Sequence, residues 1–201
     1  MVAIIDYGMG NIASVKKALD FLKIDNIITD DHEIIKKANV ILLPGVGSFG
    51  QGMRNLQERG LVDLLTDEVI VKKKQFIGIC LGMQLVMEKG NEPYPCAGLG
   101  WIKGEVIEFK LEDLNVPHMG WNNIQVVNDS YFKNCITKDF YFIHSYHVVP
   151  ENKEDIAATV SYGFDVVASV QKGNIFATQF HPEKSQNAGL SILKTFFEIH
   201  A

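Results

Sequence analysis

The first half of the chain alternates short apolar segments with segments of helical periodicity. Four apolar runs are predicted to be strands, at residues 2–6, 27–29, 40–43 and 76–80. Apolar residues at helical spacing follow each of them, at residues 12–22, 33–38, 49–72 and 81–88, with a break at Gly60. Continuously apolar strands are typical of a parallel sheet that is covered by helices on both faces.

The second half of the chain has a different character. Short strands joined by tight turns are predicted at residues 101–109, 124–127, 140–143, 156–162, 166–171 and 175–180, before a final helix at 185–199. No linker rich in Pro, Gly and Ser and no internal repeat interrupts the sequence. We therefore expect one α/β domain over residues 1–201, with a doubly wound, mainly parallel sheet and an antiparallel C-terminal strand addition.

Charge and cysteine content exclude several classes of protein. The 24 acidic and 19 basic residues leave no basic footprint for nucleic acid. The run Lys72-Lys73-Lys74 is predicted to be a solvated helix end. No apolar run approaches the ~20 residues that span a bilayer, and the N-terminus lacks signal-peptide features. Three cysteines without a C-x-x-C pair predict a reducing cytoplasm, and no metal site is expected.

The segment Gly78-Ile79-Cys80-Leu81-Gly82 joins a predicted strand to a predicted helix. A nucleophile at such an elbow needs small neighbours, which the two glycines supply. Backbone N–H groups at the start of a helix favour a thiolate and can stabilise an oxyanion. We predict that Cys80 is a nucleophile; the alternative is a small buried hydrophobic residue.

The segment His181-Pro182-Glu183 follows the last predicted strand. A thiolate nucleophile needs a base, and the base needs a group that orients it. His181 can serve as the base and Glu183 as its carboxylate partner. Because parallel strands place chemistry at their carboxyl ends, we expect a Cys80–His181–Glu183 triad. Alone, His181 would be interpreted as a partly buried structural histidine.

Two glycine-rich loops support a competing interpretation. Residues 8–13 fit the dinucleotide-binding pattern G-x-G-x-x-A, and Asp30 lies 20 residues after Gly10, while residues 45–50 fit G-x-G-x-x-G. Two matches in one small chain show how easily the pattern arises, so a nicotinamide or flavin site is the weaker hypothesis. The second loop also suits an oxyanion hole.

Four aromatic and polar segments receive simpler interpretations. Trp101 and Trp121 are predicted to be core residues, with interface anchors as the alternative. Residues 117–122 form either a contact surface or a turn. Residues 144–147 are predicted to be a polar loop, with a second catalytic base as the alternative. Met83 and Met87 are predicted to lie in the core.

The motifs Gly78-Ile79-Cys80-Leu81-Gly82 and His181-Pro182-Glu183 resemble those of the class I, or triad, glutamine amidotransferases. Within that class the chain is similar to the glutaminase subunits of imidazole glycerol phosphate synthases. That similarity rests on residues 6–11, 44–49, 117–122 and 181–185. The resemblance covers essentially the whole chain and implies a flavodoxin-like fold and no cofactor. Other triad amidotransferases usually carry Pro-Gly-Pro-Gly where this chain has Pro44-Gly45-Val46-Gly47.

The resemblance also implies roles for individual residues. Cys80, His181 and Glu183 would hydrolyse glutamine through a thioester. The backbone of Leu81 and of Val46-Gly47 would hold the oxyanion. Glutamine would be bound by three groups of residues: Gln84, Glu92 and the Ser145-Tyr146 backbone.

By resemblance, the ammonia would pass to a separate (β/α)₈-barrel cyclase subunit that makes imidazole glycerol phosphate and AICAR. Asn11, Trp121 and Lys184 are the expected interface residues. The final predicted helix ends close to Ala201, which leads us to expect the acceptor site on another polypeptide. Two alternatives remain: a paralogue that feeds a surface-sugar synthase, and a binding protein with a vestigial site.

Overall fold

The central feature of the fold is a nine-stranded sheet with the order β2-β1-β3-β4-β13-β12-β11-β8-β9. A computed structural model describes residues 1–128 and 130–200. The parallel strands are β1 (Val2–Ile5), β2 (Asn26–Thr29), β3 (Val40–Gly45), β4 (Gln75–Cys80) and β13 (Ile175–Thr178). The antiparallel part consists of β12 (Phe164–Lys172), β11 (Ile156–Tyr162), β8 (His118–Val126) and β9 (Asp139–His144). The predicted α/β class with an antiparallel addition is confirmed.

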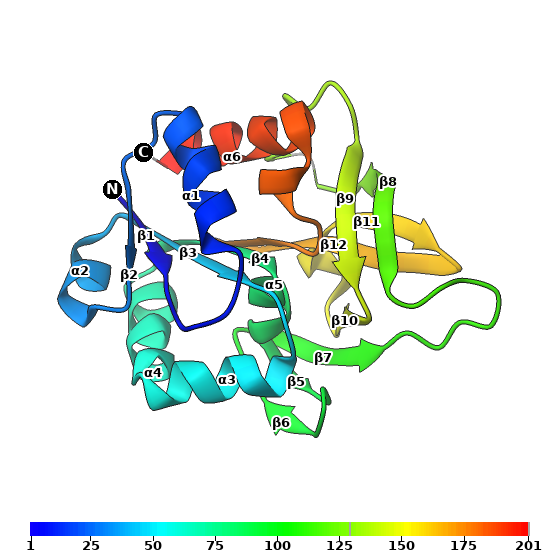
Figure 1. The fold of residues 1–201 in the computed structure, drawn as a ribbon, viewed down its shortest axis with the longest axis horizontal. Helices are drawn as coiled ribbons and strands as arrows, with labels where there is room; N and C mark the ends of the chain where they lie inside the picture. Colours follow the sequence, from blue (N-terminus) through cyan, green and yellow to red (C-terminus); the bar gives the residue numbers. More distant parts are fainter. Residues whose placement is uncertain (129, 201) are drawn as a thin grey trace.

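Helices cover both faces of the parallel strands, as Figure 1 shows. One face carries α1 (Ile12–Phe21) and α6 (Gln186–His200), whose apolar side chains pack on Val2, Ile4 and Leu42. The other face carries α2 (His32–Lys37), α3 (Phe49–Glu58), α4 (Leu61–Thr66) and the π-helix η1 (Asp67–Val71). Side chains alternate along each strand between these two cores, which accounts for strands that are apolar throughout.

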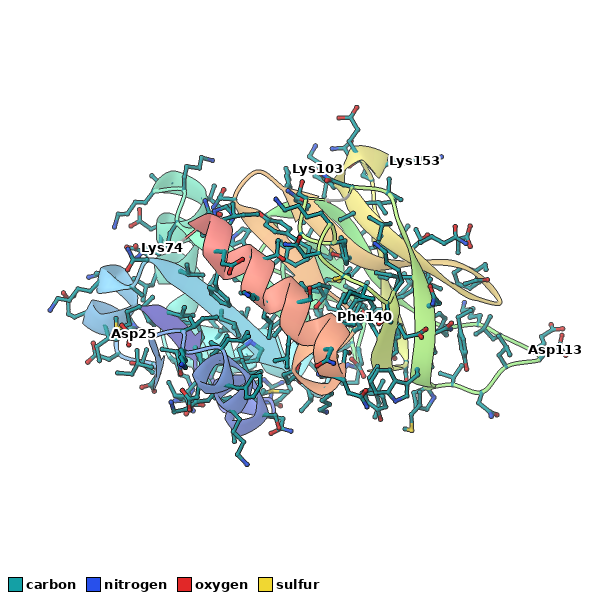
Figure 2. The ribbon with its side chains drawn as sticks, turned by 90° about the horizontal axis from the view of Figure 1, so that it is seen from above. Asp25, Lys74, Lys103, Asp113, Phe140 and Lys153 are labelled. Carbon is teal, nitrogen blue, oxygen red and sulfur yellow. The ribbon has the colours of Figure 1, made fainter. Side chains whose placement is uncertain are left out.

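A second, four-stranded sheet lies beside the first, with the order β10-β7-β5-β6. It consists of β10 (Tyr146–Pro150), β7 (Ile102–Glu108), β5 (Met87–Gly90) and β6 (Cys96–Ala97). The remaining elements are α5 (Leu81–Leu85) and the short 3₁₀ turns η2 (Lys153–Asp155) and η3 (Pro182–Lys184). Figure 2 shows α6 lying across the large sheet, with the strands of the second half gathered at one end of the molecule.

Three predictions about individual elements were wrong. The helix expected at residues 81–88 ends at Leu85, because the following backbone pairs with β7 and β6. The polar loop expected at 144–147 contains the start of β10, which pairs with β7. The loop-like segment at 117–122 is mostly strand, since β8 begins at His118 and pairs with β9. In each case a tertiary pairing overrode the local pattern.

Buried side chains test four further predictions. Met83, Met87 and Trp101 lie in the core as expected. The prediction that Trp121 lies in the core was wrong, because Trp121 is 50% exposed on β8. Lys74 is also not a solvated helix end: its ammonium pairs with the buried Glu68 carboxylate at 2.6 Å. Within residues 1–128 and 130–200, no helix combines the length and the apolar character that crossing a membrane requires.

Candidate active site

Cys80 occupies a strained elbow between β4 and α5. Its φ is +55° and its ψ is −105°, a conformation that a residue with a Cβ atom rarely adopts. A Cβ atom on Gly78 would lie 2.8 Å from the Gly82 carbonyl oxygen, and one on Gly82 would collide with the Leu43 carbonyl oxygen. Both glycines are therefore required for the close packing of strand and helix at this turn, as the sequence predicted.

The loop after β3 lies directly beside this elbow. Gly45 pairs in register with Cys80 across the parallel strands β3 and β4. Val46 and Gly47 follow, and Gly47 has a φ of +114°, which favours glycine. Gly10 approaches Gly45 closely, since a Cβ atom on Gly10 would lie 3.2 Å from the Gly45 Cα. This packing accounts for glycine in the first loop without invoking a nucleotide.

His181 and Glu183 are held near Cys80 by the strand β13, which pairs with β4. The His181 backbone N–H donates to the Tyr141 carbonyl oxygen at 2.9 Å, which fixes the start of η3. His181 Nδ1 lies 2.7 Å from Glu183 Oε1, and both side chains are 2% exposed. His181 Nε2 is buried and has no hydrogen-bond partner among the described residues, so this nitrogen is available for proton transfer.

The charge state of His181 depends on its two neighbours. Burial alone lowers its pKa, but the Cys80 sulfur and the Glu183 carboxylate outweigh burial and raise the pKa to about 10. The His181 imidazole therefore favours its protonated form at neutral pH. A protonated imidazole can donate a proton from Nε2, and it becomes a base once that proton has left. The pair therefore has the chemistry of a nucleophile and a general acid–base group.

A cavity of about 500 Å³ opens over the Cys80 side chain. Its wall includes most of the residues that the sequence predicted, namely Val46, Gly47, Cys80, Leu81, Gln84, Glu92, Ser145, Tyr146 and Lys184. His181 and Glu183 are not part of this wall, and the Cys80 sulfur acts on the His181 ring. The volume suits a ligand the size of an amino acid.

Two polar side chains in this wall are fixed by defined hydrogen bonds. Gln84 Nε2 donates to the Tyr146 carbonyl oxygen at 3.1 Å. Glu92 Oε2 accepts from the Phe49 N–H at 3.2 Å, at the start of α3. Burial raises the pKa of the Glu92 carboxyl, and the nearby Glu108 adds to that effect while the Phe49 N–H opposes it. The structure thus brings Glu92 into the pocket although its sequence surroundings gave a weak prediction.

Two buried histidines lie next to the Tyr146 backbone, and sequence reasoning did not link them. His144 Nδ1 lies 2.8 Å from the Tyr146 carbonyl oxygen, and His118 Nδ1 lies 3.0 Å from His144 Nε2. Burial lowers the pKa of His118 to about 4 and that of His144 to about 3. Both imidazoles are therefore neutral at pH 7, and His144 is not suited to be a second base at the site.

Of the three expected interface residues, Lys184 lines the pocket. Trp121 packs against Tyr141 with ring centroids 6.2 Å apart, and Lys184 Nζ lies 5.9 Å from the Tyr141 ring centroid. Trp121 and Lys184 therefore lie beside the same aromatic ring. Asn11 is exposed at the start of α1, where its side chain makes no capping hydrogen bond within the described part of the chain.

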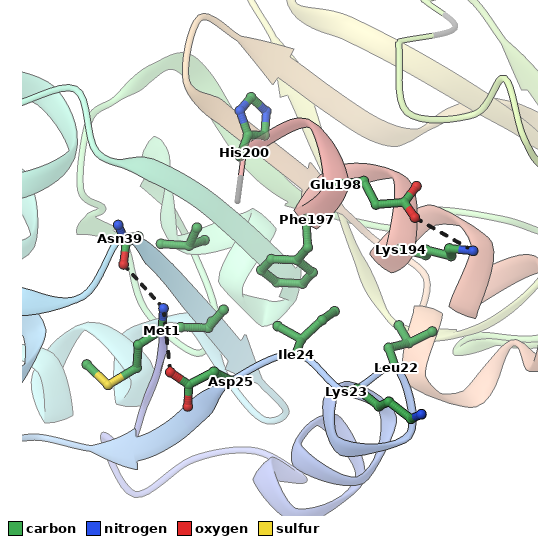
Figure 3. A pocket seen from close by; sticks show the side chains of 12 residues that line it. Met1, Leu22, Lys23, Ile24, Asp25, Asn39, Lys194, Phe197, Glu198 and His200 are labelled. Carbon is green, nitrogen blue, oxygen red and sulfur yellow. Dashed lines mark hydrogen bonds and ion pairs between the residues drawn. The ribbon is translucent and has the colours of Figure 1, made fainter.

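A separate cavity of about 370 Å³ lies at the amino ends of the parallel strands, between the first residues of β1 and β3 and the end of α6 (Figure 3). Phe197 and Ile24 line it, and the ion pair of the Met1 amino group with Asp25 lies at its border. It contains none of the predicted catalytic residues. Among residues 1–128 and 130–200, no group of His, Cys, Asp and Glu side chains is arranged to hold a metal ion.

Comparison with known proteins decides the family. The family model for glutamine amidotransferase class-I matches residues 3–199. The chain belongs to this family. It shares its fold with a crystal structure of a glutamine amidotransferase (TM-score 0.78, 17% identity, 100% and 99% of the two chains covered). PurLQS from Thermotoga maritima matches similarly (TM-score 0.74, 18% identity, 98% and 97% covered).

Curated relatives of this class I amidotransferase are much closer in sequence. "Imidazole glycerol phosphate synthase subunit HisH 1" of Campylobacter jejuni is 49% identical over 98% of each chain. Two numbered HisH subunits of Methanococcus maripaludis are 45% and 43% identical over 99% and 98% of this chain, and over 100% and 99% of their own lengths.

Proposed function

We propose that this protein is the glutaminase subunit of an imidazole glycerol phosphate synthase, which hydrolyses L-glutamine to L-glutamate and ammonia. The observation that carries the proposal is the buried Cys80–His181–Glu183 arrangement below a pocket of amino-acid size. Full-length identity of 49% to a HisH subunit supports the same function. Membership of the class I amidotransferases makes glutamine the amide donor.

The reaction begins with attack of the Cys80 sulfur on the side-chain amide carbon of glutamine. His181 Nε2 delivers a proton to the amide nitrogen, and the C–N bond breaks. Ammonia departs, and a γ-glutamyl thioester remains on Cys80. His181 Nε2 then takes a proton from water. The water oxygen attacks the thioester carbon, the C–S bond breaks, and glutamate is released. Glu183 holds the imidazole by Nδ1 and stabilises its positive charge through both steps.

Backbone N–H groups supply the oxyanion site in this mechanism. The Leu81 N–H follows the nucleophile directly, and the Val46-Gly47 segment lines the same pocket across from it. Gln84, Glu92 and the Ser145-Tyr146 backbone would bind the rest of the glutamine molecule. The Tyr146 carbonyl oxygen already accepts from Gln84 and His144, so glutamine would contact this segment through its other backbone groups.

The relatives are named as subunits of a synthase, which supports a partner chain for this protein. We propose that the partner is a (β/α)₈-barrel cyclase in the cytoplasm, to which ammonia passes directly, since released ammonia becomes protonated near neutral pH. The proposed contacts are Trp121 and Lys184, which lie beside the Tyr141 ring, and the exposed Asn11. Isolated chain is expected to hydrolyse glutamine slowly and to be activated by the partner.

A second candidate follows from the two numbered relatives in one organism. Their identities of 45% and 43% are too similar to separate a histidine-pathway subunit from a paralogue. A paralogue with the same triad would supply ammonia to another acceptor, such as a surface-sugar precursor. The acceptor chemistry lies on the partner chain.

The test is reconstitution with a candidate cyclase and its nucleotide substrate, with glutamate and imidazole glycerol phosphate measured together. The proposal predicts that the two products form in equal amounts and that both need glutamine. Glutamate without imidazole glycerol phosphate in the presence of active cyclase would favour the paralogue. Absence of glutamate in every combination would overturn the glutaminase assignment.

A further inference from the structure

Gln179 lies beside the nucleophile Cys80. It follows the end of β13 and is fully buried, with 0% of its surface exposed. Its backbone N–H donates to the Ala168 carbonyl oxygen at 2.8 Å, which fixes the main chain. Its side-chain Nε2 lies 3.7 Å from Cys80 Sγ, within the range of a hydrogen bond to sulfur. An amide in this position can donate a hydrogen bond to the sulfur that carries the proposed chemistry.

The orientation of the Gln179 amide is set by a second glutamine. Gln84 Nε2 donates to Gln179 Oε1 at 3.1 Å, and it also donates to the Tyr146 carbonyl oxygen at 3.1 Å. A carboxamide oxygen cannot donate, so Gln179 Oε1 must face Gln84 and its Nε2 must face the sulfur. Both N–H groups of Gln84 are then used, which leaves little freedom for either side chain to rotate.

Two histidines continue this hydrogen-bond network from the Tyr146 carbonyl oxygen toward β8. The Tyr146 carbonyl oxygen accepts from His144 Nδ1, so His144 Nε2 carries no hydrogen in the neutral ring. This nitrogen accepts from His118 Nδ1 at 3.0 Å. A connected row of buried polar groups therefore ends at Cys80, and each member fixes the orientation of the next.

We propose that Gln179 is a positioning residue for the nucleophile, which donates its Nε2–H to the Cys80 sulfur and stabilises the negatively charged form. The inference rests on the proposed glutaminase function of Cys80. A hydrogen bond from a neutral donor becomes stronger when its acceptor is charged, and the donor adds no charge of its own. The titratable groups that face the sulfur are His181 and Tyr7, with Glu183 behind His181, and Gln179 acts in addition to them.

The first test measures alkylation of Cys80 by iodoacetamide against pH in the full chain, with the Cys80 peptide quantified by mass spectrometry. Gln179→Met and Gln179→Ala both remove the donor, but only alanine leaves a large cavity. We expect the pH midpoint of alkylation to rise by about one unit in both variants, because a hydrogen bond to a charged group is lost. The value of kcat for glutamine, measured with the partner present, is expected to fall about tenfold.

Gln171→Met is the matched control, because Gln171 is half-buried on the neighbouring strand β12 and does not line the pocket. It is expected to leave the midpoint unchanged. A purely structural role for Gln179 predicts a different pattern, in which the alanine variant loses more activity than the methionine variant and the midpoint stays constant in both. That pattern would overturn the proposal.

The second test needs no change at Gln179. In the unmutated chain, the side-chain amide resonances of Gln179 are expected to move with pH as the Cys80 sulfur ionises, and this movement is expected to vanish in Cys80→Ala. Resonances that titrate identically in both proteins would contradict the proposal. Neither the alkylation midpoint nor the amide titration uses glutamine, so a failure of glutamine hydrolysis by the wild-type complex would count against the proposed function alone.

Discussion

His181 Nδ1 and Glu183 Oε1 lie 2.7 Å apart, and the protein buries both side chains almost completely. Because only one residue separates them, the contact depends on the local turn η3 more than on the fold as a whole. The contact assigns Nδ1 to the carboxylate and leaves Nε2 for the proton transfers at Cys80. The proposed chemistry of the site depends on this division of the two ring nitrogens.

Glu183→Gln tests that division. The amide keeps the shape of the carboxylate but removes its charge, so the imidazolium loses its stabilising partner. We expect kcat for glutamine to fall about 100-fold, with a smaller change in KM. Steady-state kinetics of the complex with its partner check this, and the exposed Glu198→Gln on α6 is the control. Equal kcat values for Glu183→Gln and wild type would contradict the role of Glu183.

Cys80→Ala tests the electrostatic link between sulfur and imidazole. The sulfur contributes to the raised pKa of His181, which is about 10 with both neighbours present. Its removal is expected to lower that pKa, while Glu183 continues to oppose the effect of burial. NMR titration of the His181 ring in both proteins measures the change. An unchanged pKa would mean that the sulfur and the ring do not interact.

The buried histidine pair predicts loss of stability in acid. The pKa values of His118 and His144 are lowered by burial from an ordinary value near 6.5 to about 4 and about 3. Protons therefore bind the unfolded chain first, and the stability contributed by the neutral rings is complete above pH ~6.5 and is lost as the pH falls toward 4 and 3. Each group contributes a slope of about 1.4 kcal/mol per pH unit in this window.

Urea unfolding of wild type and His118→Phe between pH 7 and pH 4.5 measures this slope. Phenylalanine keeps an aromatic ring against Tyr162, where the centroids are 3.9 Å apart, and removes one titrating group. In the variant, the free energy of unfolding is expected to fall less steeply with pH, by the slope that one histidine contributes. This difference in slope does not depend on the stability of the variant at pH 7. Parallel curves for the two proteins would show that His118 does not titrate in this window.

Lys74→Met tests the buried ion pair of a lysine that was predicted to lie in a solvated helix end. Lys74 Nζ lies 2.6 Å from Glu68 Oε2 and also donates to the carbonyl oxygens of Ile35 and Lys36. Its loss leaves a buried carboxylate that keeps only Lys72, and we expect a loss of about 3 kcal/mol in the free energy of unfolding. Lys72→Met is the control, because Lys72 is half-exposed and its loss is expected to cost much less. Similar losses in both variants would contradict this interpretation.

The parts of the site that depend on neighbouring residues could be predicted from the sequence. The Cys80 elbow needs Gly78 and Gly82 for steric reasons that operate within one turn, and the His181–Glu183 contact spans two positions. The parallel strands were also predictable, because burial on both faces makes them apolar throughout.

The parts that depend on long-range pairing were missed. Residues 81–88 have helical spacing, yet Met87 begins a strand because β7 offers backbone partners. Gln179 meets Cys80 across 99 positions of sequence, and His118 meets His144 across 26. No local pattern marks these contacts, since they follow from the order of strands in the two sheets.

The central claim is that Cys80 carries the glutamyl group during turnover. The most direct measurement is peptide mass spectrometry of the complex quenched in acid while it is hydrolysing glutamine. We expect a γ-glutamyl adduct on the peptide with Cys80, none on those with Cys96 or Cys135, and loss of both adduct and turnover in Cys80→Ala. Wild-type turnover by Cys80→Ala, or an adduct at another residue, would contradict it.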